Sequence, residues 1–177
     1  MGTEIGVYPM GSISYLNTFK AKRLLEDGKF HLSMGDLDQA AEAFQQSSDA
    51  SATADSLTYL GWVLSLKGQI PEAKDLCIQA IALDPEFGNA YNDLGSYLIK
   101  EESLLEAIPW LERAKTAKRY DARHFPYMNL GRIYSTLGRI DEAIAEFNKA
   151  LEIVPGHREV QNVLEQLQNI KKSEVNA

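Results

Sequence analysis

The side chains that most often perform chemistry are few in this sequence and lie far apart. The histidines are His31, His124 and His157, and none has the partner one helical turn away that two metal ligands on one helix require. The single cysteine, Cys77, cannot form an intramolecular disulfide or a cysteine-based metal site alone. Motifs of serine hydrolases, P-loop NTPases and dinucleotide-binding proteins are absent from the sequence. The sequence therefore predicts no catalytic residue, no metal site and no cofactor.

One run of basic residues stands out, formed by Arg113, Lys115, Lys118, Arg119 and Arg123. Such a run can bind phosphates while neighbouring aromatic residues stack on bases. The simpler interpretation, which we favour, is that these cations end a helix whose dipole attracts positive charge there. The whole chain has 18 Lys and Arg against 25 Asp and Glu, a net charge of −7. This acidic balance argues against a broad phosphate-binding surface, so nucleic-acid binding is kept only as an alternative.

The composition is that of a folded globular protein, with 45% hydrophobic and 24% charged residues among 177. This length fits one domain or one small repeat array. No stretch approaches the roughly 18 consecutive apolar residues of a membrane helix, and the first residues lack the basic start of a signal peptide. We therefore predict a soluble cytoplasmic protein that has no membrane partner and occupies a reducing compartment, where a lone cysteine is ordinary.

Internal repetition organises the chain. Glycines within apolar helical patterns recur at separations of 33, 34 and 36 residues, at Gly28, Gly61, Gly95 and Gly131. Each is followed twelve residues later by an alanine (Ala40, Ala73, Ala107 and Ala143) and four residues after that by a larger or apolar side chain (Phe44, Cys77, Leu111 and Phe147). A glycine lets two helices approach closely, and the alanine twelve residues on offers a matching flat surface. This position predicts that Cys77 is a buried apolar residue rather than a nucleophile.

This pattern resembles the tetratricopeptide repeat (TPR), a helix–turn–helix unit of 34 residues, over roughly residues 21–157. The resemblance implies an all-α fold, a right-handed α-solenoid with a C-terminal capping helix. The repeats it implies are 21–53, 54–87, 88–123 and 124–157, all within a repeat region of 14–157. Apolar residues on one face of 158–177 predict the capping helix with a frayed tail, and residues 1–13 predict an irregular N-terminal arm.

The third repeat departs from the pattern. It has Glu102 where the other three repeats have Gly35, Gly68 and Gly138, lacks a closing proline and is two residues longer. Pro109 lies well inside its second helix, where it removes a hydrogen bond and favours a kink. We predict that this repeat is the irregular one.

The resemblance implies that ligands bind a concave face formed by the first helix of each repeat. Carried over to this chain, the groove positions combine aromatic and apolar residues with polar anchors, and we predict peptide-binding residues Tyr59, Trp62, Leu66, Asn92, Asp93, Ile99, Phe125, Met128, Asn129 and Arg132. These positions form no cationic clamp, and Asp93 would repel a carboxylate. Recognition of heat-shock-protein tails is therefore not expected.

The function predicted is a non-catalytic adaptor that binds a peptide or helical protein segment in a concave, partly aromatic groove. The alternatives left open are a chaperone or assembly factor for one client, a cryptic enzyme, and nucleic-acid binding through Arg113–Arg123. Self-association through the aromatic surface is also open. The apolar N-terminal arm, which includes Ile5, Val7, Tyr8, Pro9 and Met10, is an equally weighted candidate to occupy the groove.

Overall fold

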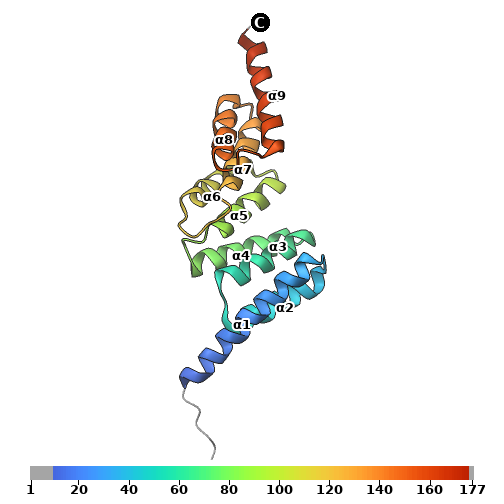
Figure 1. Ribbon diagram of the computed structural model, residues 1–177, viewed down its shortest axis with the longest axis vertical. Coiled ribbons are helices and arrows are strands. Elements are labelled where there is room, and N and C mark those ends of the chain that lie inside the picture. Colours follow the sequence, from blue (N-terminus) through green and yellow to red (C-terminus); the bar gives the residue numbers. More distant parts are fainter. Residues whose placement is uncertain (1–9, 176–177) are drawn as a thin grey trace, which may run out of the picture. The chain divides into compact units, whose positions relative to one another are not determined.

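The computed structural model describes residues 10–175, and all regular secondary structure within this range is helical (Figure 1). The helices are α1 (Met10–Ser33), α2 (Leu37–Ser51), α3 (Ala54–Leu66), α4 (Ile70–Leu83), α5 (Gly88–Lys100), α6 (Leu104–Thr116), α7 (His124–Thr136), α8 (Ile140–Ile153) and α9 (Arg158–Val175). None of these helices combines the length and the apolar character needed to cross a membrane.

The chain divides into two compact units, the first ending at Leu83 and the second beginning at Asp84. The first unit contains the helix pairs α1/α2 and α3/α4, and the second contains α5/α6, α7/α8 and α9. Helices α3, α5 and α7 begin at Ala54, Gly88 and His124, the residues at which the sequence places the second, third and fourth repeats. We call the first helix of each pair, together with α9, a leading helix.

The first helix begins earlier than the sequence predicts. The irregular arm was expected over residues 1–13, but α1 starts at Met10, so the last four of these residues are helical. Gly11 does not prevent this, because one glycine costs a helix only about 1 kcal/mol and α1 is 24 residues long. Residues 1–9, and with them most of the apolar segment considered as a groove occupant, lie outside the described range.

In three of the four helix pairs, a glycine of the leading helix faces a large side chain of the partner helix. A Cβ atom at Gly131 would lie 2.8 Å from the ring of Phe147, and one at Gly95 would lie 2.6 Å from Leu111. Real Cβ atoms do not approach other atoms this closely, so the glycine forms the notch that receives the large side chain. The sequence predicted that the alanine twelve positions after each glycine would face it. In these two pairs, the larger side chain sixteen positions after the glycine is closer.

The second repeat closes differently. A Cβ atom at Gly61 would meet the backbone oxygen of Ala73 at 3.1 Å, which is the alanine contact that the sequence predicts. Cys77, which is fully buried, stands where Phe147 stands in the fourth repeat. Because a cysteine is smaller than a phenylalanine, it does not fill the space beside the glycine, and backbone atoms become the nearest neighbours.

The turn within the third pair has a strained residue. Gly35, Gly68 and Gly138 each end a leading helix with a positive φ, and Glu102 takes this role between α5 and α6 with φ 61°. The turn keeps its geometry without glycine because the packing of α5 on α6 fixes the backbone on both sides. α6 continues as one helix through Pro109, and residues 117–123 form an irregular connection to α7. The kink at Pro109 stays a prediction.

Replacing Glu102 by glycine is expected to raise the free energy of unfolding by roughly 1 kcal/mol, because glycine adopts a positive φ without steric penalty. Urea denaturation of the full chain measures this change. The matched control is Gly138→Ala in the next pair, which is open to solvent at its Cβ position and should lose a similar amount. A Glu102→Gly variant less stable than the wild type would show that the glutamate side chain stabilises the turn.

Candidate functional site

The predicted residues of the first unit lie on one side of α3. Trp62 and Leu66 are separated by one helical turn and are 44% and 49% exposed. Tyr59 is half-buried and stacks on Phe44 with 5.2 Å between ring centroids, and its ring lies 6.3 Å from that of Trp62. The ammonium group of Lys29 lies 5.3 Å from the Tyr59 ring centroid. The structure thus brings the three residues into one aromatic surface with a cation at its edge.

The start of α3 is fixed by hydrogen bonds that set this orientation. The Thr53 hydroxyl accepts from the Ser56 amide at 3.1 Å, and the Ser56 hydroxyl accepts from the Thr53 amide at 3.1 Å, which is a reciprocal capping box. Leu57 and Leu60 of the same helix are buried. Since the helix has 3.6 residues per turn, burying these positions leaves Trp62 and Leu66 facing outward.

In the second unit, four of the predicted residues form one hydrogen-bonded ladder across the leading helices. Arg132 donates from Nη1 to Oδ1 of Asn129 at 3.3 Å, and Asn129 donates from Nδ2 to Oδ1 of Asn92 at 3.1 Å. Asn92 in turn donates from Nδ2 to Oδ1 of Asp93 at 3.3 Å. At the other end, Arg132 Nη2 donates to Glu159 Oε1 at 2.6 Å. The ladder therefore joins α5, α7 and α9 and ends in a carboxylate on each side.

Both asparagines of the ladder are buried. A buried amide must be hydrogen-bonded or it destabilises the fold. Asn129 donates to Asn92, Asn92 donates to Asp93, and Asn129 accepts from Arg132, so each asparagine keeps one amide proton for a further acceptor. Bonds to the charged ends are stronger than bonds between neutral groups. The centre of the ladder, Asn92 with Asn129, is therefore held in place by burial, whereas Arg132 and Glu159 at its end are exposed side chains.

Burial raises the pKa of Asp93 to about 7, because the surrounding protein atoms disfavour the charged carboxylate. The hydrogen bond from Asn92 and the charge of Lys100 act in the opposite direction without cancelling this effect. The residue keeps part of its surface exposed. Near neutral pH, Asp93 can therefore be either a hydrogen-bond acceptor or, when protonated, a donor.

The apolar residues predicted in this unit are not equivalent. Phe125 is exposed, with its ring centroid 4.2 Å from that of His124, whose ring lies 6.1 Å from His157. Ile99 is half-buried. Met128 is only 3% exposed and belongs to the core, so the prediction that it lines an open surface is not met by its position. The reason is that α7 packs on α5, α6 and α8, which leaves a narrow exposed strip on that helix.

The basic run is engaged in contacts within the second unit, which the sequence did not reveal. The backbone of Arg119 pairs with the turn before α5: its amide donates to the Glu86 carbonyl at 2.9 Å, and its carbonyl accepts from Gly88 at 3.1 Å. Its guanidinium donates to Asp84 Oδ2 at 2.8 Å and lies 4.0 Å from the Phe87 ring centroid. We call residues 117–123, held in this way, the clasp.

Other cations of the run complete the same arrangement. Arg113 donates to Glu86 and to the Pro85 carbonyl, and Arg123 donates to backbone carbonyls of residues 115, 117 and 118. Lys115 pairs with Glu112 and Glu146 at 3.0 and 2.9 Å. The helix-end interpretation holds for Arg113 and Lys115, which lie in the last turn of α6, but the later cations act beyond the helix. With these partners, the run offers few cations to a phosphate backbone.

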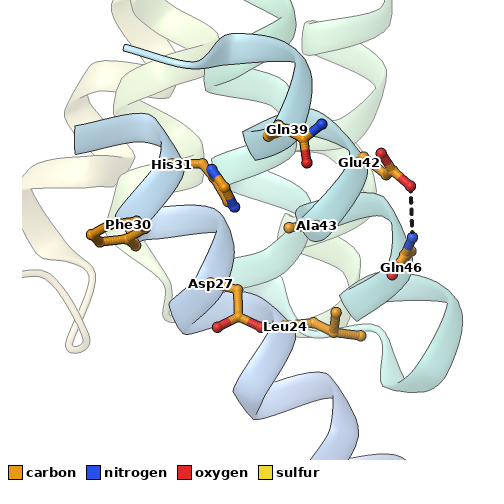
Figure 2. Close-up of a pocket in the computed structure, with 8 residues that line it drawn as sticks. All are labelled: Leu24, Asp27, Phe30, His31, Gln39, Glu42, Ala43 and Gln46. Atoms are coloured by element: carbon orange, nitrogen blue, oxygen red, sulfur yellow. Dashed lines mark hydrogen bonds between the residues drawn. The ribbon is translucent and has the colours of Figure 1, made fainter. Parts of the chain in front are cut away.

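A cavity of about 290 Å³ lies between α1 and α2 (Figure 2), and none of the predicted groove residues lines it. Glu42 accepts a hydrogen bond from Gln46 at 3.0 Å at its rim. Its lining residues are Leu24, Asp27, Phe30, His31, Gln39, Glu42, Ala43 and Gln46. The sequence signalled this region only through Asp27 and His31, which are polar where other repeats are mostly apolar. Within residues 10–175, no three His, Cys, Asp or Glu side chains are grouped as a metal site.

The stacked helix pairs of each unit, closed by the glycine notches, define an all-α solenoid repeat protein. Family models of the tetratricopeptide repeat match residues 53–83 and 86–156, which together make up more than half of the chain. The chain belongs to the tetratricopeptide-repeat family. No curated protein matches it.

Several solved structures share the fold at low identity. PilF of Pseudomonas aeruginosa is 20% identical with a TM-score of 0.83, and the match covers 90% of this chain and 72% of PilF. MamA is 25% identical with a TM-score of 0.69, over 82% of this chain and 84% of MamA. YrrB, described as a TPR protein with an unusual peptide-binding site, is 22% identical with a TM-score of 0.65, over 94% of this chain and 86% of YrrB.

Proposed function

We propose that this protein is a non-catalytic interaction adaptor whose leading helices bind an extended or helical segment of another protein. TPR proteins are in general scaffolds that do not catalyse reactions. The observation that carries the proposal is the ladder from Asp93 to Glu159, which presents donors and acceptors across three leading helices. YrrB, which shares this fold, is described as having a peptide-binding site.

The ladder suits a peptide backbone because a peptide offers both N–H donors and C=O acceptors. Asn92 and Asn129 each retain an amide proton for a carbonyl group, and the Asp93 carboxyl can accept from an amide. The buried asparagines lose little side-chain entropy when a ligand binds, so more of the interaction energy appears as affinity. Phe125, exposed on the same helix as Asn129, supplies an apolar contact for a side chain of the ligand.

The aromatic surface of the first unit is a second contact area under this proposal. Exposed tryptophan and tyrosine residues are enriched among the side chains that dominate protein interfaces. Trp62 with Leu66 offers apolar area, and Tyr59 with Lys29 offers a polar edge.

The test is a selection of peptides that bind the full-length chain, followed by affinity measurement on variants by fluorescence anisotropy. Phe125→Ala and Arg132→Ala are each expected to weaken binding roughly tenfold or more, as loss of an interface anchor does. Matched controls are Leu105→Ala, an exposed leucine on α6, and Lys149→Ala, an exposed cation on α8. Thermal unfolding of each variant separates lost binding from lost folding.

Two results would contradict the proposal. One is the failure of the selection to yield any peptide that binds the wild-type chain. The other is an equal loss of affinity for the α7 variants and for the two controls, which would assign binding to another surface. A photoreactive residue at Trp62 that crosslinks the selected peptide would extend the binding surface to the first unit.

A further inference from the structure

Among the residues that the structure describes, no other helix covers the outer face of α1, which is a stripe of apolar and charged side chains. Tyr15, Phe19 and Phe30 are 73%, 63% and 62% exposed, and Arg23 and Glu26 are exposed between them. The successive separations of these residues are four, four, three and four positions. On an α-helix, such spacing puts all five on one face.

The stripe takes little part in the packing of the described first unit, where only Phe30 among its residues also borders the cavity between α1 and α2. α1 packs on α2 and α3, and its buried residues include Ala21 and Leu24, which lie on the opposite side of the helix. Helix α9 of the second unit differs from α1 in the residues that it exposes. α9 buries Val160 and Leu164 and turns mostly polar residues outward. α1 instead presents three large aromatic residues to solvent.

Charge along α1 is divided between its two halves. Residues 10–25 contain Lys20, Lys22 and Arg23 and no acidic residue, and the first acids are Glu26 and Asp27. The later half also contains Lys29, which pairs with Glu26. When two copies of such a helix lie antiparallel, the basic half of each faces the half of the other that contains both acids. The charge pattern is therefore complementary to itself under twofold symmetry.

One antiparallel register matches both the apolar and the charged residues of the stripe. If residue 19 of one copy faces residue 30 of the other, the same register brings residue 23 opposite residue 26. Phe19 then meets Phe30 of the partner subunit, and Arg23 meets Glu26 of the partner subunit. Each contact occurs twice across the axis, because both helices contribute the same surface.

We propose that this face of α1 is the interface of a homodimer, with a second copy of the chain paired antiparallel in this register. The aromatic pairs remove apolar surface from water, and the ion pairs select the register. Glu26 also accepts a hydrogen bond from Lys29 of its own helix at 2.8 Å, which leaves its second carboxylate oxygen for Arg23 of the partner subunit. The interface uses none of the residues proposed to bind a peptide.

The test is sedimentation equilibrium of the full-length chain and of charge variants. Arg23→Glu and Glu26→Arg, made singly, each replace two attractions by two repulsions and are expected to raise the dimer dissociation constant roughly tenfold or more. The variant that combines both changes restores opposite charges and should dimerise like the wild type. Mixing the two single variants should also restore association, as a heterodimer, because each then supplies the charge that the other needs.

A control pair on another helix tests whether the effect is specific to α1. Reversing the charges of Lys149 and Glu152, an exposed pair on α8, should leave the dissociation constant unchanged. Phe19→Ser should weaken the dimer even where the charges are intact. A wild-type chain that sediments as a monomer at every accessible concentration would overturn the proposal. So would single variants that dimerise normally, or a mixture of them that stays monomeric.

Discussion

Replacement of Phe147 by alanine is expected to lower the free energy of unfolding by about 3–5 kcal/mol. The ring is 2% exposed and fills the notch at Gly131, where a Cβ atom would lie only 2.8 Å from it. Its removal leaves a cavity that two packed helices cannot collapse to fill. Urea denaturation followed by circular dichroism measures the change, and Asn148→Ala, an exposed site on the same helix, should stay within about 0.5 kcal/mol of the wild type.

A double-mutant cycle distinguishes a notch from general loss of packing. Gly131→Ala alone should destabilise the protein, because its methyl group would overlap the ring of Phe147. In the Phe147→Ala background the same change should stabilise it by roughly 1 kcal/mol, since alanine is the better helix former and the space is now free. A Gly131→Ala effect of the same sign in both backgrounds would contradict the notch.

The second large effect concerns the pH dependence of stability. The pKa of Asp93 is raised from its ordinary 3.8 to about 7 in the folded chain, so the folded state binds more protons between these values. Stability from this group is therefore greatest below pH 4 and falls as the pH rises toward 7. Full conversion of the shift corresponds to about 4 kcal/mol, and since the residue is partly exposed, we expect roughly half of this. Asp93→Asn should accordingly be more stable than the wild type at pH 8 and similar to it at pH 4.

Asp84 provides a control of opposite sign. Its pKa is lowered by the hydrogen bond from Arg119 and then by that from the Glu86 amide, so its charged form stabilises the folded state. Asp84→Asn should therefore be less stable than the wild type at neutral pH, and the difference should vanish as the pH falls through the folded pKa. Parallel stability curves for the wild type and Asp93→Asn from pH 4 to 8 would contradict the assignment for Asp93.

The recurring glycines and alanines predicted the helix pairs well, because each of these small residues is needed where two helices pack closely. A glycine is needed wherever a side chain of the partner helix packs directly against the backbone of a leading helix. Gly95 and Gly131 make room for Leu111 and Phe147 in this way. What fills the notch depends on the residue opposite it, and the sequence pattern of small residues did not distinguish the phenylalanine ring from the alanine. The start of α1 was placed too late because Gly2, Gly6, Pro9 and Gly11, together with the lack of helical periodicity in residues 1–13, indicated an irregular segment.

The candidate site was predicted only in part, since its contacts join residues distant in the chain. Asn92 and Asn129 were selected separately by repeat position, and their hydrogen bond spans 37 residues. Glu159 was not among the predicted residues, yet it closes the ladder through Arg132. Met128 was selected by the same rule as Phe125, but neighbouring helices cover it. Repeat position identifies the face of a helix and cannot tell how far its neighbours extend over it.

The clasp has a bearing on where this chain will accept inserted sequence. Most connections between helices can be lengthened at small entropic expense, since their ends need only remain near each other. Residues 117–123 are different, because Arg119 must align its own backbone with Glu86 and Gly88 while its side chain reaches Asp84. An added residue on either side would shift that alignment by one position, so a tag or a fused domain is better placed in the solvent-exposed turn around Gly68.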